Sequence, residues 1–180
     1  SWQLLSEEER QVFQKLTVFW GGFSHEAAQA VTGATLRTLL GLVNKSWLQR
    51  DDRGRYQIHL LLLQYGYEAL RQQETLWQKT KTQHAAYFKQ FLQERGRAMT
   101  GPAQKEAYEA TTLELENIRS AWNWWVEQGE FTQLVGPSLL ALVRLATVRS
   151  MSDELVPLVV TALNRFSEPP PGDSARPAYL

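Results

Sequence analysis

The chain has 180 residues, of which 43% are hydrophobic, so it can bury the core of one medium-sized domain or of two small ones. Basic and acidic residues both number 19, and this balance excludes the strong positive field by which many proteins attract nucleic acid. There is no cysteine for a disulfide or a thiolate zinc site, and the three histidines are too scattered to predict a metal site. The absence of cysteine fits a reducing cytosol, so we expect a cytoplasmic protein. The apolar runs are shorter than the roughly 20 residues of a membrane span, so we expect it to be soluble, with no membrane contact.

The first predicted helix begins after Ser6. Glu9 follows three residues later, a spacing typical of a capping box, in which each side chain bonds a free backbone N–H group of the first turn. Apolar residues then recur at helical spacing as far as Phe19, and the pair Gly21 and Gly22 breaks the pattern. We therefore expect the helix to extend to these glycines.

Two more short helices are predicted before residue 47. Ser24 is a suitable N-cap for a helix through Val31, which Gly33 would stop. A third helix is predicted from about Thr35 to Ser46. Four of its residues have the spacing of a buried stripe: Leu36, Leu39, Leu40 and Val43.

A β-hairpin and a closing helix complete the first predicted domain. Two short extended segments, 47–50 and 55–58, flank a polar turn that ends in Gly54. Helical spacing returns from 60 to 71, with four predicted inward positions, Leu62, Tyr65, Ala69 and Leu70. Three helices, a hairpin and a further helix form the order of a winged-helix domain, and we expect this domain to end at residue 73.

The rest of the chain is predicted to be helical. Breakers such as Gly129 and Ser150 separate its segments, and antiparallel helix pairs joined by short turns are typical of tetratricopeptide-like repeats. An ordinary helical bundle would have the same pattern. The predicted helices are 77–98, 103–128, 131–149 and 152–166, followed by a proline-rich connector at 169–172 and the opening of a further helix at 173–180. We expect a mainly α protein that is part of a longer one.

Six separated motifs carry a family resemblance. They are LSEEER at 5–10, LTVFWGGFS at 16–24, LVNKSWL at 42–48, RYQIH at 55–59, HAAYF at 84–88 and ELENIRSAW at 114–122. In this order they resemble the winged helix, and the start of the tetratricopeptide-type sensor that follows it, in bacterial STAND signal-transduction ATPases, the NB-ARC-like regulators. The resemblance covers residues 4–128 and is weaker beyond them.

The resemblance implies a winged helix at residues 1–73 and a truncated helical sensor at 74–180. Such proteins are switches in which an upstream nucleotide-binding domain of the same chain holds ADP or ATP with Mg²⁺. A protein or small-molecule inducer captured by the sensor permits nucleotide exchange, and the activated protein forms a homo-oligomer. This chain has no phosphate-binding loop, since Pro102 follows Gly101 where such a loop needs lysine. We therefore expect no enzyme activity and no cofactor in this chain by itself.

His59 is the residue to which the resemblance assigns a nucleotide contact. It falls on the histidine of the family's Met-His-Asp motif, which contacts the β-phosphate of ADP, and an imidazole N–H group is a suitable donor to a phosphate oxygen. Here the motif reads Ile58-His59-Leu60, so the carboxylate of its third position is missing. From the residues alone, the alternative is that His59 caps the following helix or packs under the hairpin.

The densest aromatic cluster of the chain contains three tryptophans. Helical geometry sends Trp122 and Trp125 toward one side, where we expect them in the core, and sends Trp124 elsewhere. We therefore expect Trp124 to be exposed and to contact a ligand or partner. The lone His84 is expected to be structural.

A second function remains open, that of a winged-helix DNA-binding module with a helical dimerisation arm. The outer face of the third helix would then enter the major groove. That face has few cations, and on the hairpin Asp51 and Asp52 lie among three arginines. The sequence therefore disfavours nucleic acid as a partner.

Overall fold

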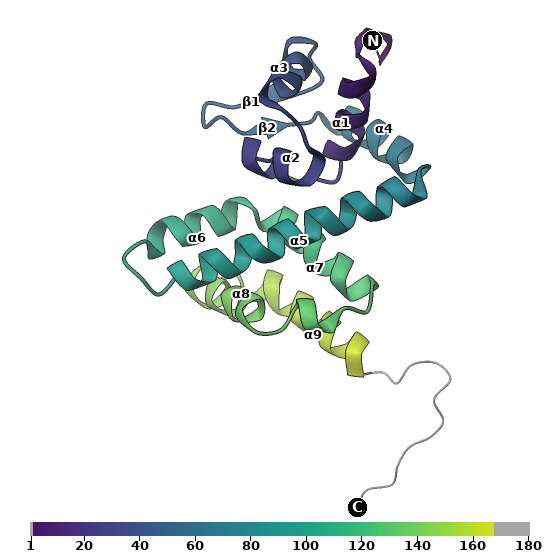
Figure 1. The fold of residues 1–180 in the computed structure, drawn as a ribbon. Coiled ribbons are helices and arrows are strands. Elements are labelled where there is room, and N and C mark those ends of the chain that lie inside the picture. Colours follow the sequence, from purple (N-terminus) through teal and green to yellow (C-terminus); the bar gives the residue numbers. More distant parts are fainter. Residues whose placement is uncertain (1, 168–180) are drawn as a thin grey trace, which may run out of the picture.

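The computed structural model describes residues 2–167, and in that range the protein is mainly helical, with one two-stranded antiparallel sheet (Figure 1). We refer to residues 2–73 as the N-terminal part and to residues 74–167 as the C-terminal part. The predicted connector and final helix, 169–180, lie outside the described residues. The elements in chain order are η1 (Trp2–Leu4), α1 (Glu7–Leu16), α2 (His25–Thr32), α3 (Leu36–Asn44), β1 (Gln49–Arg50), β2 (Tyr56–Gln57), α4 (Leu60–Arg71), α5 (Glu74–Ala98), α6 (Gln104–Leu113), α7 (Leu115–Glu127), η2 (Phe131–Gln133), α8 (Pro137–Val148) and α9 (Ser152–Ser167).

The start of α1 is fixed by the predicted capping box. Glu9 donates its backbone N–H to Ser6 Oγ (3.1 Å), and Ser6 donates its own to Glu9 Oε2 (2.7 Å). Lys45 Nζ, at the end of α3, donates to the Glu9 carboxylate at 2.7 Å, and this bond holds the pKa of Glu9 below its usual value. The cap thus also attaches α1 to α3.

The end of α1 differs from the prediction, whereas the end of α2 confirms it. α1 ends at Leu16, because the backbone N–H groups of residues 17–19 bond carbonyls three residues back and tighten the chain into a turn. Phe19 is therefore buried from a loop and not from the helix. α2 ends at Thr32 and is capped by Gly33, the predicted stop, which has a left-handed φ of 77°.

The buried face of α3 differs from the predicted stripe. Leu39 and Leu42 are fully buried and Val43 is half-buried, but Leu36 and Leu40 are 49% and 40% exposed. The prediction that Leu36 and Leu40 lie in the core is therefore wrong. The predicted stripe and the face that is actually buried are adjacent on the same helix. Only the packing of α3 against α1 decides which of them lies in the core.

The predicted hairpin is confirmed, with shorter strands. β1 and β2 pair antiparallel, with Arg50 opposite Tyr56, and Gly54 makes the turn with a φ of 78°. Asp51 Oδ1 accepts the backbone N–H groups of Arg53 (3.0 Å) and Arg55 (2.8 Å), so this carboxylate holds the turn together.

α4 has the predicted limits but buries a narrower face. Leu70 is fully buried, whereas Tyr65 is 48% exposed, so its prediction as an inward residue is wrong. The reason is that the buried face of α4 contains Gly66, which has no side chain. A Cβ atom there would lie 2.8 Å from the ring of Phe13, so α4 approaches α1 through its backbone.

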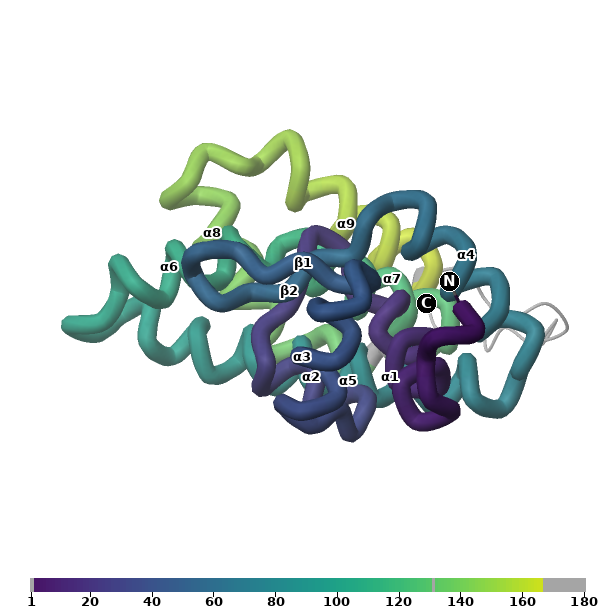
Figure 2. Tube along the Cα trace, turned by 90° about the horizontal axis from the view of Figure 1, so that it is seen from above, coloured from purple at the N-terminus to yellow at the C-terminus, as the bar shows by residue number. Residues whose placement is uncertain are grey.

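α5 is the central helix of the C-terminal part. It packs against α7 and α8, and it also contacts α2 and α4 of the N-terminal part. Seen from above, the N-terminal part lies across these longer helices (Figure 2). α5 therefore belongs to both layers of the molecule and connects them.

Two predicted helices are interrupted in the structure. The predicted helix at 103–128 divides at Glu114 into α6 and α7, since Glu114 leaves helical geometry (φ −97°, ψ 11°). The predicted helix at 131–149 becomes η2 followed by α8, which starts at Pro137 after Gly136 turns the chain with a φ of 79°. None of the helices within residues 2–167 is long and apolar enough to cross a bilayer.

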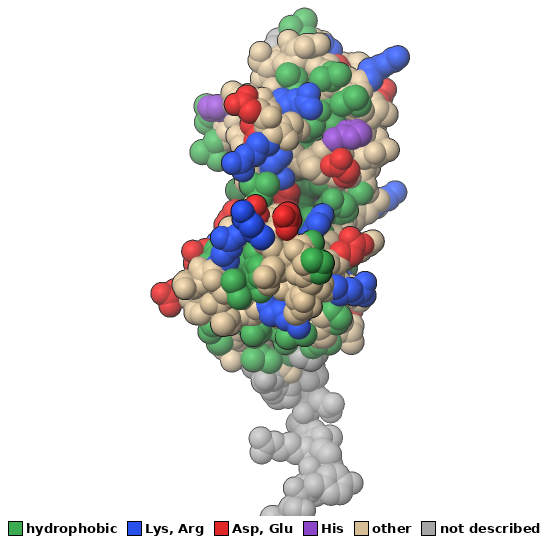
Figure 3. All heavy atoms as spheres, turned by 90° about the vertical axis from the view of Figure 1, so that its left-hand side faces the viewer, with side chains coloured by type: hydrophobic (Ala, Val, Ile, Leu, Met, Phe, Trp, Pro, Cys, Tyr) green, Lys and Arg blue, Asp and Glu red, His purple; other side chains and the backbone are tan. Residues whose placement is uncertain are grey.

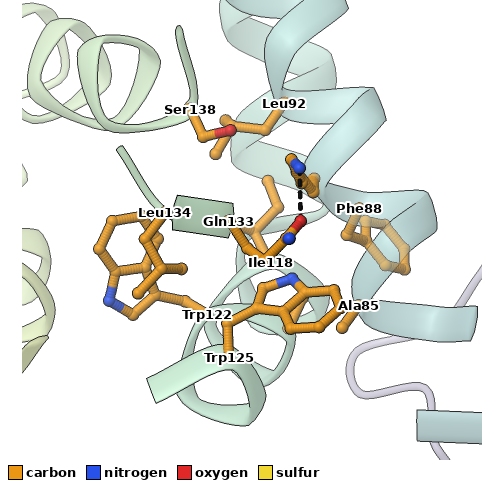
Figure 4. Close-up of a pocket in the computed structure, with 11 residues that line it drawn as sticks. Ala85, Phe88, Leu92, Ile118, Trp122, Trp125, Gln133, Leu134 and Ser138 are labelled. Atoms are coloured by element: carbon orange, nitrogen blue, oxygen red, sulfur yellow. Dashed lines mark hydrogen bonds between the residues drawn. The ribbon is translucent and has the colours of Figure 1, made fainter. Parts of the chain in front are cut away.

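The core of the C-terminal part includes Trp122, as predicted. Its indole Nε1 donates to the carbonyl oxygen of Leu158 at 3.0 Å, and Trp125 is half-buried beside it. Trp122, Trp125 and Leu134 lie around the same small space (Figure 4), and Lys89 Nζ, which also lines it, donates a hydrogen bond to Gln133 Oε1 at 2.5 Å. The free space there is only about 10 Å³, which is close to one water molecule, so this is a packed core and no ligand site.

Candidate functional site

The two parts of the molecule are joined by a buried ion pair. Arg55, directly before β2, contacts the carboxylate of Glu114, the residue between α6 and α7. The two residues are only 8% and 6% exposed. A buried pair of this kind is sensitive to the loss of either partner, since the remaining charge would be left without compensation. We call it the junction pair.

Asn117 extends this junction by one turn of α7. Its side-chain oxygen accepts the backbone N–H of Trp20 (2.8 Å), and its amide donates to the carbonyl of Gly22 and to Glu114 Oε2 (2.8 Å each). Asn117 is fully buried, and these three bonds use most of its hydrogen-bonding capacity. The loop before α2 and the hairpin are therefore both attached to α7.

His84 lies behind this network and is fully buried. Its Nε2 is 3.5 Å from Asn117 Oδ1, and its ring lies against Phe19 and Phe88. Burial, and secondarily the positive charge of Lys81, lowers the pKa of His84 to about 3. The side chain is neutral at physiological pH, and its burial agrees with the expected structural role.

His59 is exposed at the N-terminus of α4. Its Nδ1 accepts the backbone N–H of Leu61 at 3.4 Å, so the histidine caps the helix, as one of the two interpretations of the sequence expected. It lies four residues after Arg55 on the same β2 segment, and the next two residues, Leu60 and Leu61, are 68% and 70% exposed. The phosphate contact of His59 stays a prediction, and the exposed ring is accessible to a neighbouring domain.

Trp124 is only 4% exposed, so the expectation that it faces solvent is wrong. α7 packs against α5 and also against α9, and it therefore buries more than one face. Trp122 reaches Leu158 in α9, whereas the Trp124 ring meets the Trp77 ring of α5 edge-on at 6.3 Å. The role of Trp124 in ligand or partner binding stays a prediction.

Trp124 closes one end of a row of four aromatic rings on one side of the junction. Edge-on contacts connect Trp20 to Tyr67, Tyr67 to Trp77, and Trp77 to Trp124, with centroid distances of 6.3, 4.9 and 6.3 Å. The rings border a hollow of about 290 Å³. We call this the aromatic side of the junction.

Lys81 supplies a cation to the aromatic side. Its Nζ is 5.5 and 5.6 Å from the rings of Trp77 and Trp124 and donates to Ser120 Oγ at 2.9 Å. Burial lowers the pKa of Lys81, while the negative charge of Glu127 opposes this shift. The ammonium group therefore already has partners within this hollow.

A larger cleft opens beside the junction pair. Its volume is about 540 Å³, and α2, α5, α6 and Arg55 form its walls. Seen from the side of the hairpin turn, acidic and basic side chains gather where the molecule narrows between its two parts (Figure 3). We call this the junction cleft. No cluster of histidine and carboxylate groups suitable for a metal ion occurs in the part of the chain that the structure describes.

The sequence-based reasoning missed the junction pair and the cleft. It considered Arg55 only as a charge on the hairpin and as part of one motif, and Glu114 only as part of another. The two residues are 59 positions apart, and neither has a local pattern that points to the other. Helical geometry is interrupted at Glu114, the residue that contacts Arg55. The neighbouring sequence contains no glycine or proline that would have predicted this interruption.

Comparisons with protein-family models, with curated proteins and with solved structures found no match to this chain. The function must therefore be argued from the site itself.

Proposed function

We propose that this chain is the relay and sensor segment of a STAND signal-transduction ATPase. In this proposal residues 1–73 are a winged helix, and residues 74–180 belong to a tetratricopeptide-like sensor. The order of three helices, a hairpin and a closing helix before a further set of helices supports the assignment. The partners would be an upstream nucleotide-binding domain of the same chain and a protein or small-molecule inducer, with homo-oligomers in the activated state.

The junction pair is the observation that carries the proposal. A relay needs a physical connection between the sensor helices and the nucleotide contact. Glu114 and Asn117 come from the sensor side, and Arg55 begins the short segment that ends in His59. A shift of α7 on inducer binding would therefore move the hairpin and the histidine together.

The cap on α4 also prepares His59 for a phosphate contact. Since Nδ1 accepts the N–H of Leu61, the neutral ring carries its proton on Nε2. This N–H group is a donor on an exposed side chain, which is what an approaching ADP phosphate requires. The bound nucleotide would be ADP in the resting state, or ATP with Mg²⁺ after exchange.

The test is the variant His59→Ala in the longer protein that contains the nucleotide-binding domain. Loss of a hydrogen bond to a charged group, about 1.5–3 kcal/mol, predicts ADP release roughly 10- to 100-fold faster. The half-buried His25 at the start of α2 provides the matched control, and His25→Ala should leave the release rate unchanged. Equal ADP release from the wild type and His59→Ala would refute the phosphate role.

The alternative of a DNA-binding module has weaker support. The outer face of α3 presents the apolar side chains of Leu36 and Leu40 beside Arg37, and Lys45 is engaged with Glu9. Few cations are thus free to neutralise phosphates. A fluorescence-anisotropy titration with duplex DNA at moderate salt distinguishes the two functions, because the relay proposal expects no specific binding.

A further inference from the structure

Arg55, which lines the junction cleft, has a buried hydrogen-bond donor without an acceptor. The Arg55 guanidinium contacts Glu114 through Nη1, while its Nη2 is buried and has no hydrogen-bond partner among the described residues. The second oxygen of Glu114 already accepts the amide of Asn117. A buried donor of this kind is unfavourable. Because Nη2 has almost no accessible surface, an acceptor in the cleft that Arg55 lines can reach it only if the guanidinium group turns away from Glu114.

The other charges of the cleft decide what kind of acceptor can enter. Its walls contain three carboxylates, from Glu26, Glu94 and Glu114, and two guanidinium groups, from Arg55 and Arg95. Hydrogen bonds from its own backbone N–H and from Ser24 keep the pKa of Glu26 low, so that this carboxylate is ionised. A simple anion would therefore meet an excess of negative charge, whereas a ligand with an additional ammonium group would not.

The remaining wall of the cleft is apolar. Tyr87, Phe88 and Phe91 of α5 lie on one side, and Leu113 at the end of α6, which is 45% exposed, lies on the other. A volume of about 540 Å³ is within the range of small-molecule sites, which combine apolar walls with a few polar groups. The cleft therefore suits a small ligand with two charged poles and one apolar group.

We propose that the junction cleft binds a free α-amino acid with an apolar side chain. The Arg55 guanidinium group turns from Glu114 to donate to the carboxylate, the ammonium group lies near Glu26 and Glu94, and the side chain packs against the rings of α5. This inference rests on the proposed relay function, for which the amino acid would be the inducer. Its carboxylate would compete with Glu114 for Arg55 and so weaken the connection between α7 and the hairpin.

The test is isothermal titration of the 180-residue chain with L-phenylalanine and L-leucine. Two analogues of phenylalanine test the contribution of each charged group. 3-Phenylpropanoate has no ammonium group, and 2-phenylethylamine has no carboxylate. We expect saturable binding of at least one amino acid, with both phenyl analogues weaker by about 10-fold or more if phenylalanine binds. If neither amino acid binds, or if 3-phenylpropanoate binds as well as phenylalanine, the proposal is overturned.

Variants locate the ligand within the cleft. Arg55→Lys keeps the charge but lacks the second guanidinium nitrogen, and it should weaken binding by about 10-fold. Arg53→Lys, on the exposed hairpin turn, is the matched control and should bind as the wild type does. If Arg55→Lys does not fold, the exposed Glu26→Gln and Glu94→Gln take its place, and unchanged affinity in both refutes the site.

The binding test and the relay test can fail separately. Titration of this chain involves no nucleotide, whereas ADP release from the longer protein involves no amino acid. If the chain binds no amino acid but His59→Ala releases ADP faster, the relay proposal stands and the ligand proposal is refuted. If the chain binds an amino acid but ADP release from His59→Ala is unchanged, the cleft remains a binding site and the relay proposal is refuted.

Discussion

The two sides of the junction join the same parts of the protein by different chemistry. On one side Arg55, Glu114 and Asn117 form a buried polar network, with directional bonds that allow few arrangements. On the aromatic side, rings such as Tyr67 and Trp77 meet edge-on around a hollow. Ring contacts tolerate sliding better than charged hydrogen bonds do, because their energy depends less on direction.

This difference indicates how the junction could move. If the polar network were released, the aromatic side could keep the two parts together while their relative orientation changed. α5 contributes residues to both sides, Phe88 to the cleft and Trp77 to the row of rings, and it would be the axis of such a movement. The polar side should then determine stability more strongly than the aromatic side.

The largest expected effect is at the junction pair. Arg55→Ala should lower the free energy of unfolding by about 3–5 kcal/mol, because Glu114 would remain buried without its partner. Urea unfolding followed by tryptophan fluorescence measures this change. The double variant Arg55→Met with Glu114→Met removes both charges and should be less destabilised than Arg55→Ala. A loss below about 1 kcal/mol in Arg55→Ala would show that the polar side does not dominate.

A smaller effect should appear on acidification through His84. The unfolded chain binds a proton on this histidine near pH 6.5, but the folded protein does so only near pH 3, so stability is retained above pH 6.5 and lost as the pH falls toward 3. At pH 4.5 the loss is about 2–3 kcal/mol, from about 1.4 kcal/mol for each pH unit. Urea unfolding at several pH values measures this slope.

Two variants isolate the contribution of His84 from that of the carboxylates. His84→Gln keeps a hydrogen-bond donor toward Asn117 but does not titrate, and its stability should fall less steeply between pH 6.5 and 4.5. His25→Gln changes the half-buried histidine of α2 and should retain the wild-type slope. Identical slopes for His84→Gln and the wild type would contradict a buried, neutral His84.

The smallest effect is expected on the aromatic side. Trp20 is 41% exposed and meets the ring of Tyr67 edge-on, so Trp20→Ala should cost about 1 kcal/mol. Trp20→Phe retains an aromatic contact and should lie closer to the wild type. Thermal unfolding of the two variants measures the difference. A loss in Trp20→Ala as large as that in Arg55→Ala would reverse the comparison between the two sides.

Sequence reasoning succeeded where a few neighbouring residues decide the structure. The capping box of Ser6 and Glu9, the stop at Gly33 and the hairpin turn at Gly54 are all present, since each depends on groups within about one turn of the chain. It failed at Leu36 and at Trp124 because several faces of each helix are compatible with the pattern.

The sequence by itself determined that this protein is mainly helical, where most of its helices begin and end, and that one hairpin separates α3 from α4. The tertiary structure alone decided which face of α3 is buried, that α7 is covered on two sides, and that Arg55 meets Glu114. Caps and turns are local hydrogen-bond choices. Burial and ion pairing over 59 positions depend on how the complete chain packs, and no short segment contains that information.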